Sequence, residues 1–121
     1  PELKEFAEAN YKKPMKFNIN LYACFIKRCC ELTDELGKVG MINPLTFMYI
    51  KSFEEVRKYI LINTHINIFV EHSADSTNMF SDSGGFASAP SYYVLEKDLT
   101  IKVNSKFISL DQYTRTPQEK F

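Results

Sequence analysis

The stretch from Leu21 to Ile60, LYACFIKRCCELTDELGKVGMINPLTFMYIKSFEEVRKYI, decides the fold of this chain. Its first part predicts an amphipathic helix over Leu21–Leu36. Apolar residues recur there at spacings of four, four, three and four: Leu21, Phe25, Cys29, Leu32 and Leu36. A second apolar row runs beside the first and consists of Tyr22, Ile26 and Cys30. An apolar face this wide indicates that the helix is buried against a sheet.

Both ends of this helix carry residues typical of helix caps. Asn20 precedes the helix, and its side chain is expected to accept a hydrogen bond from an amide of the first turn. Gly37 follows it and is expected to adopt the left-handed conformation that closes many helices. The next segment, Lys38–Asn43, is short and apolar, so we predict a buried parallel strand rather than an edge strand, ended by Pro44.

A second helix is predicted to begin at Ser52. The sequence Ser-Phe-Glu-Glu from this residue fits a capping box, in which Glu55 returns a hydrogen bond to the amide of Ser52. The spacing of the following apolar residues predicts one buried face, made of Phe53, Val56, Ile60 and Leu61. Helix, strand and helix together predict half of a layered α/β domain.

Shorter elements flank this unit. In chain order we predict a helix at Pro1–Tyr11, a strand at Ile66–Val70, a polar loop at Glu71–Pro90, a hairpin of Tyr92–Glu96 and Leu99–Val103, and an irregular tail at Ser105–Phe121. We therefore expect one domain with four parts. These are a lead-in helix and connector (1–20), a helix-strand-helix-strand core (21–70), a flexible loop (71–90), and a hairpin with its tail (91–121).

Composition narrows the function classes without choosing one. The chain has 121 residues, with fifteen Lys and Arg against fifteen Asp and Glu, so net charge gives no argument for nucleic acid or for an anionic membrane. Its apolar runs all fall short of the roughly 18 residues that a membrane span needs, and we predict a soluble, cytoplasmic protein with no membrane partner. The sequence begins at Pro1 rather than at a methionine, which we interpret as a part of a larger protein.

The three cysteines, Cys24, Cys29 and Cys30, fall within one predicted helix. An odd number on one helix fits neither a disulfide framework nor the paired spacing of a zinc site. We interpret them as reduced thiols of the core and expect no metal site. His65 and His72 flank a predicted strand without an obvious third ligand, and we interpret them as ordinary surface histidines.

Three segments follow one another in a recognisable order. They are LYACFI at Leu21–Ile26, GKVGMINP at Gly37–Pro44, and Phe47 followed by FEEVRKYI at Phe53–Ile60. Together they resemble the middle of an adenine-N6-specific DNA methyltransferase, most closely the large methylase of restriction-modification and BREX-type phage-exclusion systems. The resemblance covers about Pro1–Lys97. It implies an α/β fold, namely a partial Rossmann-like methyltransferase sheet with flanking helices and a late antiparallel hairpin.

The resemblance also implies what this chain lacks. Members of the family bind S-adenosylmethionine through a glycine-rich turn and hold the target amine with an Asn-Pro-Pro-Tyr motif. Neither occurs here, since Asn43-Pro44 ends a different strand and is followed by Leu45. We therefore expect the C-terminal half of a catalytic domain with no catalytic residue of its own and with weak or no cofactor binding. Its parent protein would methylate DNA.

Four aromatic residues receive roles by this resemblance. Phe25 matches an aromatic residue that packs near the adenine of the cofactor, and Tyr22 is its neighbour; the alternative is that both belong to the core. Phe80 matches an aromatic residue beside the flipped target adenine, and Phe86 is a rival for this role. The alternative for both is that they anchor the loop.

Two further expectations follow. A non-catalytic interaction module with a methyltransferase-like fold is the alternative to an enzyme fragment. In either case, half of a parallel sheet leaves an open edge and uncovered apolar surface, so we predict that the chain associates with itself.

Overall fold

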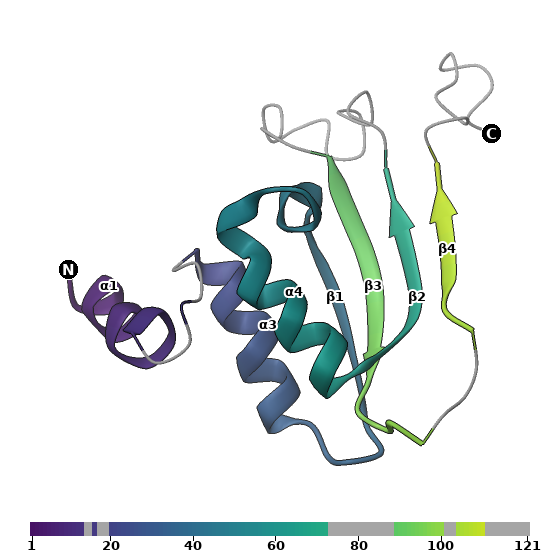
Figure 1. Cartoon of the computed structure of the whole chain (residues 1–121), viewed down its shortest axis with the longest axis horizontal. Helices are drawn as coiled ribbons and strands as arrows, with labels where there is room; N and C mark the ends of the chain where they lie inside the picture. The colour runs from purple at the N-terminus through teal and green to yellow at the C-terminus, as the bar shows by residue number, and fades with distance from the viewer. Residues whose placement is uncertain (14–15, 17–19, 73–88, 101–103, 111–121) are drawn as a thin grey trace.

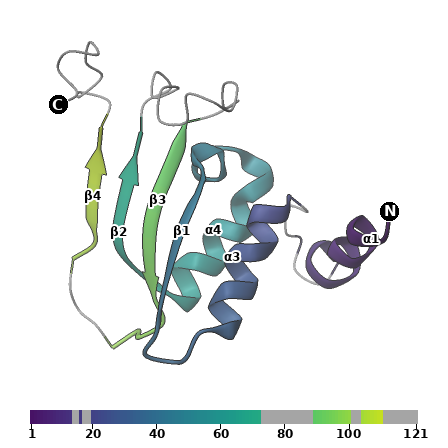
Figure 2. The same ribbon diagram turned by 180° about the vertical axis from the view of Figure 1, so that it is seen from behind.

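A four-stranded mixed sheet forms the centre of the chain, and the helices α3 and α4 lie on one of its faces (Figures 1 and 2). The computed structural model describes residues 1–13, 16, 20–72, 89–100 and 104–110. The strands are β1 (Lys38–Pro44), β2 (His65–Glu71), β3 (Pro90–Glu96) and β4 (Lys106–Ser109). The predicted α/β class is therefore confirmed.

The strand order is β1-β3-β2-β4. Strand β3 runs antiparallel to both β1 and β2, while β4 runs parallel to β2. Because β1 and β2 are both antiparallel to β3, they point in the same direction, and α4 connects them as a crossover helix (Figure 1). The strand predicted at Ile66–Val70 is confirmed as part of β2.

Three predictions about strand pairing are wrong. The segment Lys38–Asn43 is the edge strand of the described sheet, and it pairs antiparallel with β3 rather than parallel with a neighbour. The predicted hairpin partner of β3 is replaced by β1 and β2, and Leu99 lies in a turn. The predicted irregular tail contains β4, where the ring of Phe107 stacks on that of Phe69 with the ring centroids 5.8 Å apart. Pairing partners come from distant parts of the chain, so local patterns do not reveal them.

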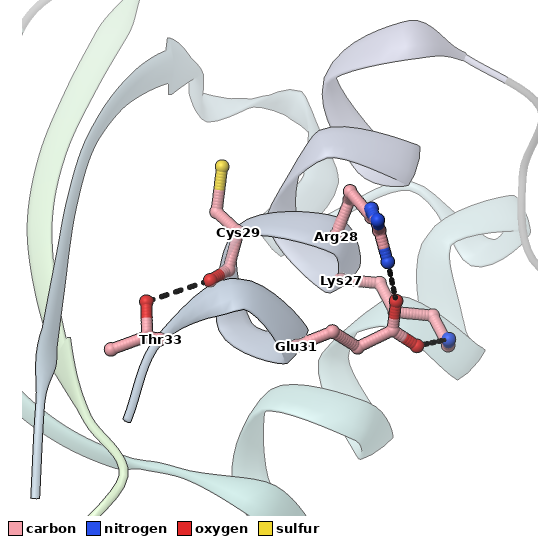
Figure 3. A network of polar contacts seen from close by, with 5 residues as sticks. All are labelled: Lys27, Arg28, Cys29, Glu31 and Thr33. Carbon is pink, nitrogen blue, oxygen red and sulfur yellow. Dashed lines mark hydrogen bonds and ion pairs between the residues drawn. The ribbon is translucent and has the colours of Figure 1, made fainter. Parts of the chain in front are cut away.

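Helix α3 spans Leu21–Leu32 and is four residues shorter than predicted. Asn20 caps it as predicted, since its Oδ1 accepts a hydrogen bond from the backbone amide of Tyr22 at 3.4 Å. The helix ends because Thr33 adopts an extended backbone, and the Thr33 hydroxyl donates to the carbonyl of Cys29 at 2.7 Å (Figure 3). Gly37 is not the predicted left-handed cap. A Cβ atom at this position would lie 2.3 Å from the methyl group of Thr33, so close packing requires the glycine.

The prediction for the buried side of α3 is confirmed in part, since Ile26 and Cys30 of the second predicted row are buried. The main predicted row is the exposed one, with Leu21, Phe25 and Leu32 exposed. The buried residues of the helix are Ala23, Cys24, Ile26 and Cys30. Small side chains on this side allow the helix to lie close to the sheet, which the larger row would not permit.

The polar surface of α3 carries a small charge network. Glu31 accepts from Lys27 one turn earlier and forms an ion pair with Arg28 at 3.4 Å (Figure 3). The hydrogen bond from Lys27 is the main reason why the pKa of the Glu31 carboxyl is lowered. Lys27 also lies over the ring of Tyr11 at 5.6 Å, which connects α3 to the N-terminal helix.

The N-terminal segment is helical, as predicted. Helix α1 (Glu2–Ala7) continues into the π-helical segment η1 (Glu8–Lys12). Ala7 and Tyr11 are buried, whereas Leu3 and Phe6 remain exposed. In the described residues, no helix is long and apolar enough to cross a membrane.

Helix α4 spans Glu54–Asn63 and follows two short 3-10 segments, η2 (Leu45–Met48) and η3 (Lys51–Phe53). The predicted capping box at Ser52 is wrong, because Ser52 already lies inside the η3 turn and α4 begins two residues later. Phe53, Val56 and Ile60 are buried, as predicted. Leu61 is instead 69% exposed.

The core lies between the sheet and the two helices, and Phe47 of η2 is at its centre. The Phe47 ring is 2% exposed and contacts the rings of Tyr22, Phe69 and Tyr93, with centroid distances of 6.3, 6.3 and 5.5 Å. Aromatic pairs at such distances add to the stabilisation from burial. Phe47 therefore joins α3, β2 and β3 through one side chain.

All three cysteines are free thiols. Cys24 and Cys30 are buried and Cys29 is half-buried. Burial is the main reason why the pKa of the Cys30 thiol is raised, which keeps it protonated. The predicted core role is confirmed for Cys24 and Cys30.

Replacing Phe47 by alanine is expected to destabilise the fold by about 3–5 kcal/mol, because the substitution leaves a cavity between three rings. Urea unfolding followed by circular dichroism measures this loss. Leu61→Ala is the control, since the exposed Leu61 side chain should change the unfolding free energy by no more than about 0.5 kcal/mol. Equal losses in the two variants would contradict this account of the core.

A pH effect is expected from Glu96, which is 4% exposed and bonded to Lys38 at 2.8 Å and to Asn67 at 3.1 Å. The hydrogen bond from Lys38 is the largest cause of the lowered pKa of the Glu96 carboxyl. Its contribution to stability is present above the unfolded-state pKa of about 4.3 and is lost as the pH falls through the lower folded-state value. The stability difference between wild type and Glu96→Gln, measured by urea unfolding, should therefore shrink as the pH falls below about 4. A difference that stays constant down to pH ~3 would contradict the shift.

Candidate functional site

The carboxyl ends of β1 and β2 lie at the same edge of the sheet, because the two strands point in the same direction (Figure 1). We call this region the carboxyl edge; it comprises the ends of β1 and β2, the start of β3, the segment η2 and the first turn of α3. Open α/β sheets bind their ligands outside the carboxyl ends of the strands. The carboxyl edge is therefore the candidate functional site.

Within this edge, Tyr22 connects the first turn of α3 to η2. Its hydroxyl lies 3.2 Å from the hydroxyl oxygen of Thr46, which lies in η2, two residues after the end of β1. Its ring stacks on that of Phe53, with a centroid distance of 5.3 Å and an angle of 11° between the planes. Burial raises the pKa of the Tyr22 hydroxyl, and the hydrogen bond to Thr46 acts in the opposite direction. Tyr22 is thus a packed aromatic residue whose polar end lies at the carboxyl edge.

Phe25 lies one turn further along α3, and its side chain is 57% exposed. The ring lies outside the buried core, so an aromatic face is accessible to solvent beside the first turn of the helix. Flat heterocycles stack on such faces. A role for Phe25 and Tyr22 at the cofactor stays a prediction.

Phe80 and Phe86 lie outside the described residues, and so does most of the predicted loop at Glu71–Pro90. Both described ends of this segment are held at the carboxyl edge. The amide of His72 donates to the carbonyl of Pro90 at 3.1 Å, and the amide of Leu45 donates to that of Ala89 at 2.8 Å. The segment therefore leaves and re-enters the sheet at the candidate site.

Sequence reasoning missed a buried polar cluster at the same edge. The Asn43 side-chain amide donates to the hydroxyl of Tyr93, and the Ser91 hydroxyl donates to the Asn43 carbonyl at 3.0 Å. Burial strongly raises the pKa of the Tyr93 hydroxyl, which keeps it neutral. The signal that could have found this cluster is a polar residue at the end of an apolar strand.

Two further residues complete the edge. The Tyr49 hydroxyl donates to the Glu71 carboxylate at 3.2 Å, and the imidazole of His72 meets the ring of Tyr92 edge-on at 4.8 Å. Partial burial lowers the pKa of His72, so its imidazole is neutral at neutral pH. Within the part of the chain that the structure covers, no group of three or more His, Cys, Asp or Glu side chains could hold a metal ion. The edge thus offers aromatic faces, neutral hydroxyl, amide and imidazole groups, and the carboxylate of Glu71.

Comparison with solved structures gives the class of fold. A protein from Listeria monocytogenes, described as a class I S-adenosylmethionine-dependent methyltransferase, superposes with a TM-score of 0.59 and 23% sequence identity. The match covers 78% of this chain and 28% of that structure, so the chain spans less than a third of its neighbour. The mixed sheet with its helices is accordingly a part of a class I methyltransferase fold.

Comparison with family models identifies the family. The model of the Eco57I restriction-modification methylases matches residues 1–80, which is more than half of the chain. The chain belongs to the Eco57I restriction-modification methylase family. No curated protein matches it. The methylase family expected from the sequence is confirmed, whereas adenine-N6 specificity and the BREX type stay predictions.

The contact between Tyr22 and Thr46 can be tested by a double-mutant cycle. Tyr22→Phe keeps the stacked ring and removes the hydroxyl, which should cost about 0.5–1.5 kcal/mol of unfolding free energy. Thr46→Val should cost a similar amount, and the double variant should cost less than the sum because both changes remove one hydrogen bond. Urea unfolding of the four proteins measures the coupling, and strictly additive losses would contradict the contact.

Proposed function

We propose that this chain is one part of a methyltransferase that transfers a methyl group from S-adenosylmethionine to N6 of adenine in DNA. The observation that carries the proposal is the match of residues 1–80 to the restriction-modification methylases, a stretch that includes β1, β2 and the first turn of α3. These elements build the carboxyl edge. The system in which the parent protein acts is restriction-modification or BREX-type phage exclusion.

The roles of the residues are those that the resemblance to the methylase family implies. Phe25 offers its exposed ring to the adenine of the cofactor, and Tyr22 lies one turn earlier on the same helix. Phe80 or Phe86 stacks on the target adenine after it leaves the DNA helix, because an enzyme must extrude a base before it can act on the base edge. The chain contributes one wall of the pocket, while the glycine-rich turn and the Asn-Pro-Pro-Tyr motif belong to another part of the parent protein.

We assign no proton transfer to a residue of this chain. When bound, S-adenosylmethionine would supply the methyl group: its sulfur–methyl bond would break as the carbon–nitrogen bond to N6 forms, S-adenosylhomocysteine would leave, and the proton lost from the amine would pass to solvent. The aromatic residues at the carboxyl edge position flat rings and exclude water from them. DNA is contacted mainly by other parts of the parent protein, because this chain has no net charge with which to attract the phosphates.

A second function remains a candidate because of the exposed apolar row of α3, in which Leu21, Phe25 and Leu32 face solvent. Such a row suits a non-catalytic interaction module with a methyltransferase-like fold. Methyl transfer by the protein that contains this chain decides between the two. Tritium from labelled S-adenosylmethionine that appears in N6-methyladenine of digested DNA supports the enzyme, and its absence in a correctly folded protein supports the module.

Isothermal titration calorimetry of this chain with S-adenosylmethionine is expected to show a dissociation constant of about 1 mM or weaker, because one wall buries little of the ligand. Binding in the low micromolar range would contradict the proposed location of the main cofactor contacts. In the longer protein, Phe25→Ala should weaken cofactor binding by about 5-fold to 100-fold, as expected for the loss of one stacking contact. Leu32→Ala is the matched control, since Leu32 is similarly exposed on the same helix and lies two turns away.

A further inference from the structure

The connection between β1 and α4, residues 45–53, lies at the carboxyl edge of the sheet (Figures 1 and 2). It contains the short segments η2 and η3, and we call it the η2–η3 loop. Two of its side chains contact Tyr22 of α3. The hydroxyl oxygen of Thr46 lies 3.2 Å from that of Tyr22, and the ring of Phe53 stacks on the Tyr22 ring with a centroid distance of 5.3 Å. The conformation of this loop therefore determines where the first turn of α3 is held.

Arg57 of α4 binds the backbone of this loop. A single guanidinium nitrogen, Nη1, donates to the carbonyl of Phe47 at 2.6 Å and to the carbonyl of Ile50 at 2.8 Å. The carbonyl of Ile50 also accepts from the amide of Phe53 at 3.1 Å, so η3 is connected to the same cation. Hydrogen bonds from a charged donor are stronger than those between neutral groups. Arg57 thus joins both segments of the loop to α4.

The loop needs this support because its own secondary structure is short. The segments η2 and η3 have four and three residues, and 3-10 turns have poorer hydrogen-bond geometry than an α-helix. The amides of Tyr49 and Ile50 share one acceptor, the carbonyl of Thr46, at 3.1 and 3.0 Å. Phe47 and Phe53 are buried, whereas Tyr49 and Ile50 between them are exposed. Burial therefore contributes little at the middle of the loop, where the guanidinium binds.

Packing positions the stem of Arg57. The stem lines a hollow of about 70 Å³ together with apolar side chains of η2, α4 and the sheet, among them Met48, Ile60 and Phe69. Apolar surroundings of this kind hold the methylene groups of an arginine while its charged head reaches polar atoms. An unbranched apolar side chain at this position would keep most of the packing and lose the bonds to the loop.

We propose that Arg57 is a positioning residue for S-adenosylmethionine, which acts through the η2–η3 loop and Tyr22 on the first turns of α3. The inference rests on the proposed function, in which Phe25, one turn after Tyr22, offers its exposed ring to the adenine of the cofactor. That adenine is remote from the methyl group that moves, so a contact with it is equally strong before and during the transfer. Arg57 therefore acts on the binding of the cofactor and not on the chemical step.

Amide hydrogen exchange of this chain tests the connection between Arg57 and the loop. In Arg57→Met, the amides of Tyr49, Ile50 and Phe53, which bond to carbonyls of the loop, should exchange about tenfold faster or more. The amide of Thr64 bonds to the last turn of α4 and is the internal reference, expected within about twofold of wild type. Equal acceleration at all four amides would show a general loss of stability and would overturn the proposal, as would no acceleration.

Steady-state kinetics of the protein that contains this chain test the role in cofactor binding. In Arg57→Met the KM for S-adenosylmethionine should rise about 5-fold to 50-fold, below the ~100-fold that a displacement of about 1 Å can cost, while kcat stays within about threefold. Lys58→Met is the matched control. It removes the same charge one residue further on, where the lysine pairs with Glu54 and Glu55 on the surface of α4, and both constants should stay within about twofold of wild type.

Two further variants test the route and guard against misfolding. Arg57→Lys should recover part of the lost affinity, because its ammonium group keeps the charge and the donors. In Arg57→Met combined with Tyr22→Phe, the rise in KM should be smaller than the product of the two single rises, because both changes loosen one connection. A full product would show that Arg57 acts independently of Tyr22 and would overturn the route. If circular dichroism shows that Arg57→Met is unfolded, Arg57→Gln replaces it, since its amide is too short to reach the loop.

The kinetic outcomes separate this inference from the proposed function. A folded Arg57 variant with an unchanged KM, or with a fall in kcat alone, overturns the inference and leaves the proposed function standing. A wild-type protein that transfers no methyl group overturns the proposed function, and the inference falls with it. The two failures are distinguishable because the second appears without any substitution.

Discussion

The pairing of β3 with β1 on one side and β2 on the other holds this structure together. Strand β3 pairs with seven consecutive residues of β1, from Lys38 to Pro44, and it also pairs with β2 along its length. The crossover through α4 makes β1 and β2 point in the same direction, and β3 lies between them in the sheet. The carboxyl edge therefore exists only after a strand from the last third of the chain has entered between two strands from the middle.

Packing on the helical side depends on the same pairing. Tyr93 of β3 and Phe69 of β2 stack with their ring centroids 5.6 Å apart, and Phe47 closes over both rings. Arg57 of α4 then fixes the chain around Phe47 by donating to the carbonyls of Phe47 and Ile50, at 2.6 and 2.8 Å. The short 3-10 segments between β1 and α4 are thus held from the core and from the helix. This explains why the polar groups of the candidate site lie on a rigid support.

The sequence predicted the elements of this fold better than it predicted their neighbours. Helix α3, helix α4 and strand β2 follow from apolar spacing, and the cap at Asn20 follows from the chemistry of a single side chain. Of the two apolar rows predicted to be buried on α3, the row with Ile26 and Cys30 is buried and the row with Leu21, Phe25 and Leu32 is exposed. The buried side also carries the small residues Ala23 and Cys24. The edge position of β1 and the pairing of β4 with β2 depend on contacts between distant segments, which periodicity does not contain.

In the candidate site, too, local features could be predicted from the sequence, whereas contacts between distant residues could not. Its location follows from the direction of two strands, and Tyr22 was found through a resemblance. The cluster of Asn43, Ser91 and Tyr93 was missed because it joins residues about fifty positions apart. An asparagine at the end of a strand is also common in ordinary turns, so by itself it does not indicate a buried polar cluster.

The clamps at the ends of the segment between His72 and Ala89 have a consequence for how such proteins diversify. Backbone hydrogen bonds at 3.1 and 2.8 Å fix both ends of this segment against the sheet, and they use no side chain of the segment itself. Insertions, deletions and substitutions between the clamps are expected to leave the pairing of β2 with β3 intact, because the free energy of closing a connection rises only slowly with its length. The residues between the clamps can therefore change in number and kind while the fold that holds both ends is inherited unchanged.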